Sequence, residues 1–201
     1  MIKGYKTKTM ENKEEKEQKI LDSAFQLFTE KGFKDTSIQE IVDHAGVAKG
    51  TFYLYFKDKY EIQDYLITYK SNQLFLKAIK HVEKLKIEKF EDRIIAIIDY
   101  LIDEFKKHEE LLLFISKNLS LGVFGDSLTN LLHRDSLGVL EILKKEIDEN
   151  NINIKNPELT LFMVIELTSS VVFSSIISNK PMPIDELKPH LYEKIKKLLI
   201  D

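Results

Sequence analysis

The chain has 201 residues and a formal net charge of −3, with 30 Lys and Arg residues against 33 Asp and Glu residues. This length predicts one large domain or two small ones, with a core that needs no covalent reinforcement. Because cysteine is absent, disulfides and thiolate metal sites are excluded. The charge balance gives no sign of nucleic-acid binding, so any basic surface must be local.

The N-terminal segment, MIKGYKTKTMENKEEKEQK, is polar and contains no apolar core of a secretory signal. We expect residues 1–13 to form a flexible, solvated tail. A second interpretation, a loose arm that binds the DNA backbone, is left open by its lysines Lys3, Lys6, Lys8 and Lys13. Apolar residues at helical spacing follow from Ile20 to Phe28, and Gly32 fits the end of that helix.

Residues 35–62 predict two short helices and the start of a long one. The segment DTSIQEIVDHAG holds two overlapping capping boxes, Thr36-x-x-Gln39 and Ser37-x-x-Glu40, ahead of an apolar stripe. These signals indicate a helix of about two turns that ends near Gly46. A second short helix is expected over about residues 48–54, and the capping pattern of "DKYE" starts a third helix that runs to about residue 82.

Two short helices joined by a glycine-containing turn, with a third behind them, constitute a helix-turn-helix. The second helix of this motif enters the major groove of DNA. The apolar residues suffice to pack these elements: Ile38, Ile41, Val42, Val47, Phe52 and Phe56. Hydroxyl and ammonium groups are common phosphate donors, and glycine lets a backbone approach closely. The candidate DNA-binding residues of this segment are therefore Lys49, Gly50, Thr51, Tyr53, Tyr55, Lys57 and Lys59. For the two tyrosines, a place in the core is the alternative.

Helical periodicity continues over residues 90–105, 109–119 and 132–147, with Gly122 and Gly125 interrupting it. The most apolar stretch then follows Asn156-Pro157, which predicts a helix start with an Asn cap and Pro in the first position.

We expect this apolar helix to run to about residue 178. Because it is apolar almost all round, it should be buried on most sides, and Glu166 argues against a membrane span. The segment NKPMPIDEL is expected to be a loop. A last helix follows, with Pro189 in its first turn or just before it.

Residues 19–62 resemble the DNA-binding domain of the TetR family of bacterial transcriptional regulators. The motifs that carry this resemblance are Ala24-Phe25, Leu27-Phe28, Gly32-Phe33, Thr36-Ser37-Ile38, Ala45-Gly46-Val47, Lys49-Gly50-Thr51, Tyr53, Tyr55-Phe56 and Lys57-x-Lys59. Beyond residue 85 the likeness is confined to the order and length of the helices.

The resemblance implies an all-α homodimer of about nine helices per subunit. Residues 14–60 would be the helix-turn-helix head, 61–84 a connecting helix, and 85–201 a ligand-binding and dimerisation domain. The last two helices would pair with those of the partner. A small-molecule inducer would re-space the two heads and release a palindromic DNA operator.

By matching position, the resemblance implies that Thr36, Ser37, Lys49, Thr51, Tyr53 and Lys59 touch phosphates or bases. Gln39 and Tyr55 lie where relatives often reach base edges. Two departures stand out: Ala48 replaces a common Ser, which removes a side-chain cap, and Tyr55 replaces a common His.

The head contains no arginine, since the two arginines are Arg93 and Arg134. The commonest specific base contact is Arg or Lys to guanine, so only Lys49 can make it from the second short helix. We therefore expect an A·T-rich operator, read by Gln39 at adenine, by Thr51 at thymine methyl groups and through DNA shape.

The second half offers weaker signals. Glu166 shares its side of the apolar helix with Phe162, Ser170 and Phe173, a setting that could bind a cationic ligand. A polar point in a dimer seam and a wet edge are the alternatives for this carboxylate. Further candidates for a pocket wall are Phe105, Phe114, Phe124, Ser136 and Met163.

The histidines are scattered without metal-ligand spacing, and no catalytic or nucleotide-binding motif occurs. We expect no catalytic residues, no metal and no cofactor. The sequence predicts a cytoplasmic, ligand-responsive DNA-binding regulator, most simply a repressor, that has no contact with a membrane. An all-α carrier or enzyme with a vestigial DNA-binding head, and a helical adaptor, remain alternatives.

Overall fold

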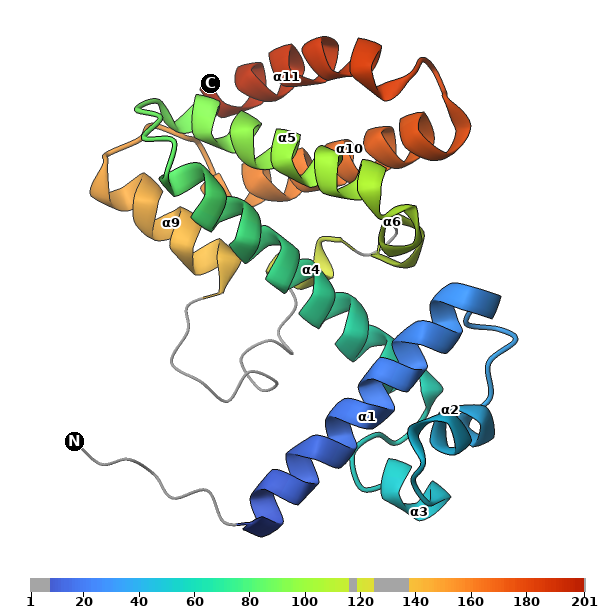
Figure 1. Cartoon of the computed structure of the whole chain (residues 1–201). Helices are drawn as coiled ribbons and strands as arrows, with labels where there is room; N and C mark the ends of the chain where they lie inside the picture. The colour runs from blue at the N-terminus through green and yellow to red at the C-terminus, as the bar shows by residue number, and fades with distance from the viewer. Residues whose placement is uncertain (1–7, 116–118, 125–137, 201) are drawn as a thin grey trace, which may run out of the picture. The chain divides into compact units, whose positions relative to one another are not determined.

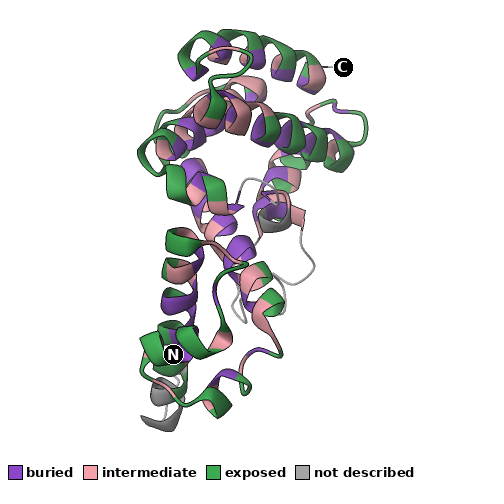
Figure 2. Cartoon of the chain, turned by 90° about the vertical axis from the view of Figure 1, so that its right-hand side faces the viewer, coloured by how far each residue is buried: buried purple, intermediate pink, exposed green. Residues whose placement is uncertain are grey.

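The computed structural model describes residues 8–115, 119–124 and 138–200. All regular structure in these ranges is helical, which confirms the all-α class. The chain divides into two compact units, residues 1–66 and 67–201. In both units the buried residues form stripes along one side of the long helices (Figure 2).

The first unit contains α1 (Lys8–Lys31), α2 (Ile38–Ala45), α3 (Lys49–Phe52) and the start of α4 (Lys59–Glu83). Helix α1 packs against α2, and α2 packs against α3 (Figure 1). The expected tail is corrected in part, because α1 begins at Lys8 and residues 8–13 are therefore helical. The core of this unit is formed by Ile20, Leu21, Ala24, Phe28, Ile41, Val42, Phe52, Phe56, Ile62 and Leu66.

Local signals set the ends of α2 as the sequence predicts. Ser37 is the N-cap and forms a capping box with Glu40, and Gly46 ends the helix with a φ of 66°. A left-handed conformation of this kind favours glycine. Ala48 gives α3 no side-chain cap. The Asp58 carboxylate accepts hydrogen bonds from the backbone amides of Tyr60 and Glu61, both at 2.9 Å, and so caps α4.

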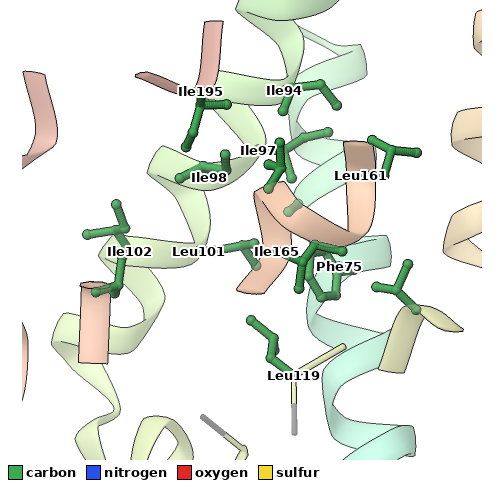
Figure 3. Packing of buried hydrophobic residues seen from close by; sticks show 14 of the residues in the cluster. Phe75, Ile94, Ile97, Ile98, Leu101, Ile102, Leu119, Leu161, Ile165 and Ile195 are labelled. Carbon is green, nitrogen blue, oxygen red and sulfur yellow. The ribbon is translucent and has the colours of Figure 1, made fainter. Parts of the chain in front are cut away.

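The second unit contains the rest of α4 and the helices α5 (Phe90–Lys107), α6 (Glu109–Ile115), α7 (Leu121–Phe124), α9 (Val139–Glu149), α10 (Pro157–Ser178) and α11 (Ile184–Ile200). Helices α5, α10 and α11 pack against one another, and α9 packs against α7 and α10. Figure 3 shows side chains of α4, α5, α10 and α11 meeting in this core. Each helix contributes a buried side chain to this core: Phe75 from α4, Ile97 from α5, Ile165 from α10 and Ile195 from α11.

Helix α10 corrects one expectation about packing. By length and composition it could cross a membrane, but 44% of its most apolar window is buried inside the unit. A row of its residues is nevertheless exposed, so α10 is not covered on most sides. Its start is also different in detail: Pro157 occupies the first turn as expected, whereas Asn156 is left-handed and its side chain makes no capping bond.

Three other predictions of the helix pattern need correction or lie outside the described residues. Helix α11 begins at Ile184, earlier than expected, and Pro189 lies inside it. Gly122 does not interrupt the helical pattern, because it belongs to α7. The expected helix over 132–147 is described only from Val139, so Ser136 lies outside the described residues.

Ion pairs join α5 to α11. The Lys188 ammonium lies 2.8 Å from the Asp99 carboxylate and 2.9 Å from that of Asp103. The Tyr192 hydroxyl donates to Asp99 at 2.5 Å. Although burial raises the pKa of Asp99, the hydrogen bonds from Lys188 and Tyr192 bring the pKa below its usual range. Only 17% of the Lys188 side chain is exposed, whereas the side chains of Asp99 and Asp103 are 47% and 52% exposed, so solvent partly screens this link between α5 and α11.

Replacing Lys188 with methionine is expected to lower the free energy of unfolding by about 1 kcal/mol at neutral pH, because the half-exposed carboxylates are partly screened by solvent. Asp99 has a lowered pKa in the folded state, so its stabilisation is present above the ordinary aspartate pKa of about 4 and is lost as the pH falls below it. The difference between variant and parent should therefore shrink towards about pH 3. Urea unfolding at both pH values measures this, with Lys194→Met at an exposed position of α11 as the control.

Candidate functional sites

Helix α3 and the turn after it present a polar and aromatic surface. Phe52 is fully buried and Phe56 is 3% exposed, so these side chains anchor the segment. The opposite side carries Lys49 and Gly50, both exposed, and Tyr53, which is 52% exposed. A Cβ at Gly50 would meet no protein atom within 4 Å, so the fold itself does not require glycine there. The arrangement leaves open backbone beside a lysine and a tyrosine, as a groove-binding helix needs.

Leu54 belongs to the same surface, although the sequence analysis did not predict it as a DNA-binding residue. It is 75% exposed, more than any other large hydrophobic residue among those described. An exposed leucine can contact thymine methyl groups in the major groove. The i, i+4 spacing of Phe52 and Phe56 is the signal that could have found it, because that spacing turns the residues between them outward.

Thr36 does not have the role expected from the sequence. Its side chain is buried, with the residue 1% exposed. Its hydroxyl lies 2.9 Å from the Gly32 carbonyl and 3.3 Å from the Leu27 carbonyl. This hydroxyl fastens the turn between α1 and α2 to the end of α1, so it cannot reach a phosphate.

Lys59 also makes contacts that the sequence analysis did not predict. Its ammonium donates to the backbone carbonyls of Phe33 at 2.7 Å and Thr36 at 2.8 Å, and it lies 4.3 Å from the centre of the Phe33 ring. It thereby ties the start of α4 to the turn between α1 and α2. Its charge is therefore engaged by carbonyls of the head. Lys57, by contrast, is exposed.

The two candidates at the start of α2 lie on the surface. Ser37 is exposed and its hydroxyl hydrogen-bonds the Glu40 carboxylate at 2.7 Å. The Gln39 amide is also exposed and donates to Asp43 at 2.8 Å. Thr51 is half-buried in α3. Tyr55 is half-buried as well, and its hydroxyl donates at 2.9 Å to the backbone carbonyl of Lys13 in α1. The hydroxyl of Tyr55 therefore points at α1.

In the second unit, Phe124 and Phe162 meet edge to face with ring centres 5.4 Å apart. They line a hollow of about 730 Å³ between α7, α9 and the start of α10. Leu159 and Ile147 add apolar surface, and the Lys144–Glu158 ion pair, at 2.5 Å, lies at the same hollow. Two of the sequence candidates for a ligand pocket are thus brought together in a hollow large enough for a small molecule.

The other pocket candidates are dispersed. Phe105 is buried in the general core, and Phe114 and Phe173 are half-buried against it. Met163, Glu166 and Ser170 lie exposed on α10. Glu166 does not line the hollow at Phe124, nor a second one of about 510 Å³ between α4, α5 and α9.

Arg93 lines the second hollow. Its guanidinium donates to the backbone carbonyls of Ile87 at 2.9 Å and Glu88 at 2.7 Å, and it also forms an ion pair with Glu146. These bonds fix the turn between α4 and α5 to α9. Within the described ranges no group of three or more His, Asp or Glu residues could hold a metal ion.

The second unit also contains a set of buried polar atoms that the sequence analysis did not predict. Asn72 is 1% exposed, and neither end of its amide has a hydrogen-bond partner in the described part of the chain. The hydroxyls of Ser71 on α4 and Thr168 on α10 are buried and unpartnered in the same way. Buried polar groups are nearly always paired, so these atoms are candidates for pairing with a bound molecule. In the sequence, these buried polar groups could have been recognised from the pair Ser71-Asn72, which lies about one turn before Phe75 on the buried side of α4.

Comparison with known proteins gives a consistent family. Residues 20–66 match the model of the bacterial regulatory proteins of the tetR family. The uncharacterized regulator YhgD of Bacillus subtilis is 25% identical over 158 residues, which cover 77% of this chain and 81% of that protein. The fatty acid metabolism regulator protein of Bacillus subtilis is 33% identical over 112 residues, which cover 56% of this chain and 48% of that protein.

Solved structures share the fold along most of the chain. The fatty acid degradation regulator FadR from Bacillus halodurans has a TM-score of 0.61 at 19% identity, over 90% of this chain and 97% of that one. FadR from Bacillus subtilis, solved in complex with stearoyl-CoA, has a TM-score of 0.57 at 18% identity, over 89% and 97% of the two chains. The helix-turn-helix geometry, the family match and these folds agree. Residues 20–66 form a DNA-binding domain of the TetR family of bacterial transcriptional regulators, and the chain shares the fold of these solved regulators.

Proposed function

We propose that this protein is a homodimeric repressor in the cytoplasm that binds a palindromic operator and releases it when a small molecule binds to residues 67–201. The observation that carries this proposal is the surface of α3, where Lys49, Gly50 and Tyr53 are exposed over buried phenylalanines. A gel shift with the DNA upstream of its own gene tests it. A shift at low salt is expected, because phosphate contacts are strongest there, and the absence of any shift would refute the proposal.

The proposed DNA contacts are Ser37, Gln39, Lys49, Gly50, Thr51, Tyr53 and Lys57, with Leu54 added to them. Arginine is absent from the head, and Lys49 is the only cation on α3. Apolar contacts from Leu54 and Thr51 favour thymine over guanine. We therefore expect that selection from a random DNA pool will yield palindromic half-sites rich in A·T pairs. Enrichment of guanine-rich half-sites would contradict this reading of α3.

Replacing Gly50 with alanine separates DNA binding from folding. Within the protein the new Cβ meets no atom, and alanine is the better helix former, so the free energy of unfolding should stay equal or rise by up to about 1 kcal/mol. If a DNA backbone approaches Gly50 closely, operator affinity should fall by about tenfold or more, since a misplaced contact of this kind costs at least about 1.4 kcal/mol. Gel shifts and urea unfolding measure the two effects. Wild-type affinity for Gly50→Ala would remove Gly50 from the interface.

The exposed row on α10 supports the homodimer. The apolar members are Leu159, Phe162, Met163 and Leu167, which follow one another at helical spacing. Glu166 and Ser170 lie exposed on the same helix. A contiguous apolar strip on a soluble protein indicates an interaction surface. Glu166 thus becomes a polar member of the proposed dimer seam, in place of a cation-binding group in a pocket.

The proposed ligand is an amphipathic molecule with a long apolar part. Two observations support this: the hollow at Phe124 and Phe162, and the unpartnered buried groups Ser71, Asn72 and Thr168. The named activity of the fatty acid regulators among the similar proteins points the same way. Stearoyl-CoA is the first probe. It should release the operator in the gel shift, and an operator complex that persists at saturating stearoyl-CoA would contradict this choice of ligand.

A further inference from the structure

The N-terminal turns of α1 are fastened to the turn after α3. The Tyr55 hydroxyl donates to the backbone carbonyl of Lys13 at 2.9 Å, although the two residues are 42 positions apart in the sequence. The Lys13 ammonium lies 5.9 Å from the centre of the Tyr55 ring. A cation within about 6 Å of an aromatic face is attracted to it. Backbone and side chain of Lys13 are therefore both held at Tyr55.

The tyrosine is itself firmly placed. Its ring packs against Phe56 with centres 6.4 Å apart, and Phe56 is buried in the core of the head. Burial, followed by the nearby Glu17 carboxylate, raises the pKa of the Tyr55 hydroxyl. The hydroxyl accordingly keeps its proton at neutral pH and remains a donor to Lys13.

Lys13 is exposed, with its ammonium beside the Tyr55 ring. Two carboxylates of α1, those of Glu15 and Glu17, lie near Lys13 in the sequence. Glu15 pairs with Lys19 at 2.7 Å and is neutralised by it, whereas Glu17 acts on Tyr55. Lys13 thus presents an exposed positive charge next to the turn after α3.

We propose that Lys13 contacts an operator phosphate at the edge of the α3 surface, and that Tyr55 is the positioning residue that holds it there. Tyr55 then acts through α1 and reads no base. This inference rests on the proposed DNA-binding function. It adds a cation to a recognition surface that has only Lys49 on α3, and it gives the N-terminal part of α1 a defined place in the complex.

Operator affinity measured over a range of salt concentrations tests the assignment. Each phosphate contact contributes about −0.9 to the slope of log affinity against log salt. Lys13→Gln removes one phosphate contact from each subunit of the proposed homodimer, so it should reduce the magnitude of the slope by about 1.8. Its affinity deficit should then shrink about twelvefold between 50 and 200 mM salt. Tyr55→Phe should reduce the slope similarly, because the ammonium loses its fixed place, and the double variant should show no further reduction. Lys19→Gln, at a lysine already paired with Glu15, is the matched control with an unchanged slope.

An unchanged slope for Lys13→Gln would overturn the phosphate contact. A reduced slope for Lys13→Gln together with an unchanged slope for Tyr55→Phe would overturn the positioning role. These failures differ from a failure of the proposed function, in which the parent protein itself would not shift operator DNA at low salt.

Discussion

Met163→Asp is expected to leave the protein monomeric and to weaken operator binding by about 100-fold or more. Met163 is 41% exposed in the middle of the apolar row on α10. In the proposed dimer the new carboxylate would be buried without a partner, once in each subunit, at a cost of several kcal/mol. A monomer binds one half-site at a time and loses the gain in effective concentration that linking two heads provides, on the order of 10²-fold to 10⁴-fold.

Sedimentation and gel shifts measure the two consequences of Met163→Asp. Leu85→Asp is the matched control, because Leu85 is also an exposed hydrophobic residue of the second unit but follows the end of α4. It should remain dimeric and bind DNA normally. A dimeric Met163→Asp with normal operator affinity would show that the partner packs elsewhere.

The ends of the short helices could be predicted from sequence because they are determined locally. The capping box of Ser37 and Glu40 and the left-handed Gly46 involve residues at most four positions apart. Helix α10 shows where such prediction stops. Its composition identified a long apolar helix, but composition does not say which side the chain itself covers. The exposed row is the side that the second unit leaves uncovered.

The roles of Thr36, Tyr55 and Lys59 could not be read from sequence for a related reason. Hydroxyl and ammonium groups in a helix-turn-helix suit DNA phosphates, and they equally suit backbone carbonyls of the head. Lys59 meets Phe33, which is 26 residues away, and Tyr55 meets Lys13 at 42 residues. Such pairings depend on how the helices pack, so residue type alone favours the wrong partner. Leu54 is the opposite case, an apolar residue that packing turns outward.

The buried amide of Asn72 leads to the second large expected effect. Asn72→Leu should raise the free energy of unfolding by about 1–3 kcal/mol, because it removes a buried amide that has no hydrogen-bond partner within the described residues. Leucine also has the higher helix propensity, by a few tenths of a kcal/mol. A natural sequence that retains such a cost at a core position is expected to gain function from it. If the amide binds the polar part of the inducer, the stabilised variant should still bind operator but no longer release it with stearoyl-CoA.

Urea unfolding and the gel shift with stearoyl-CoA test the two halves of this prediction separately. Asn72→Asp is the matched control, since it has the same size but buries a charge without a partner and should destabilise the protein by several kcal/mol. A stabilised Asn72→Leu that still responds to stearoyl-CoA would place the inducer elsewhere, with the hollow at Phe124 and Phe162 as the remaining site. A destabilised Asn72→Leu would mean that the amide is hydrogen-bonded in the free protein.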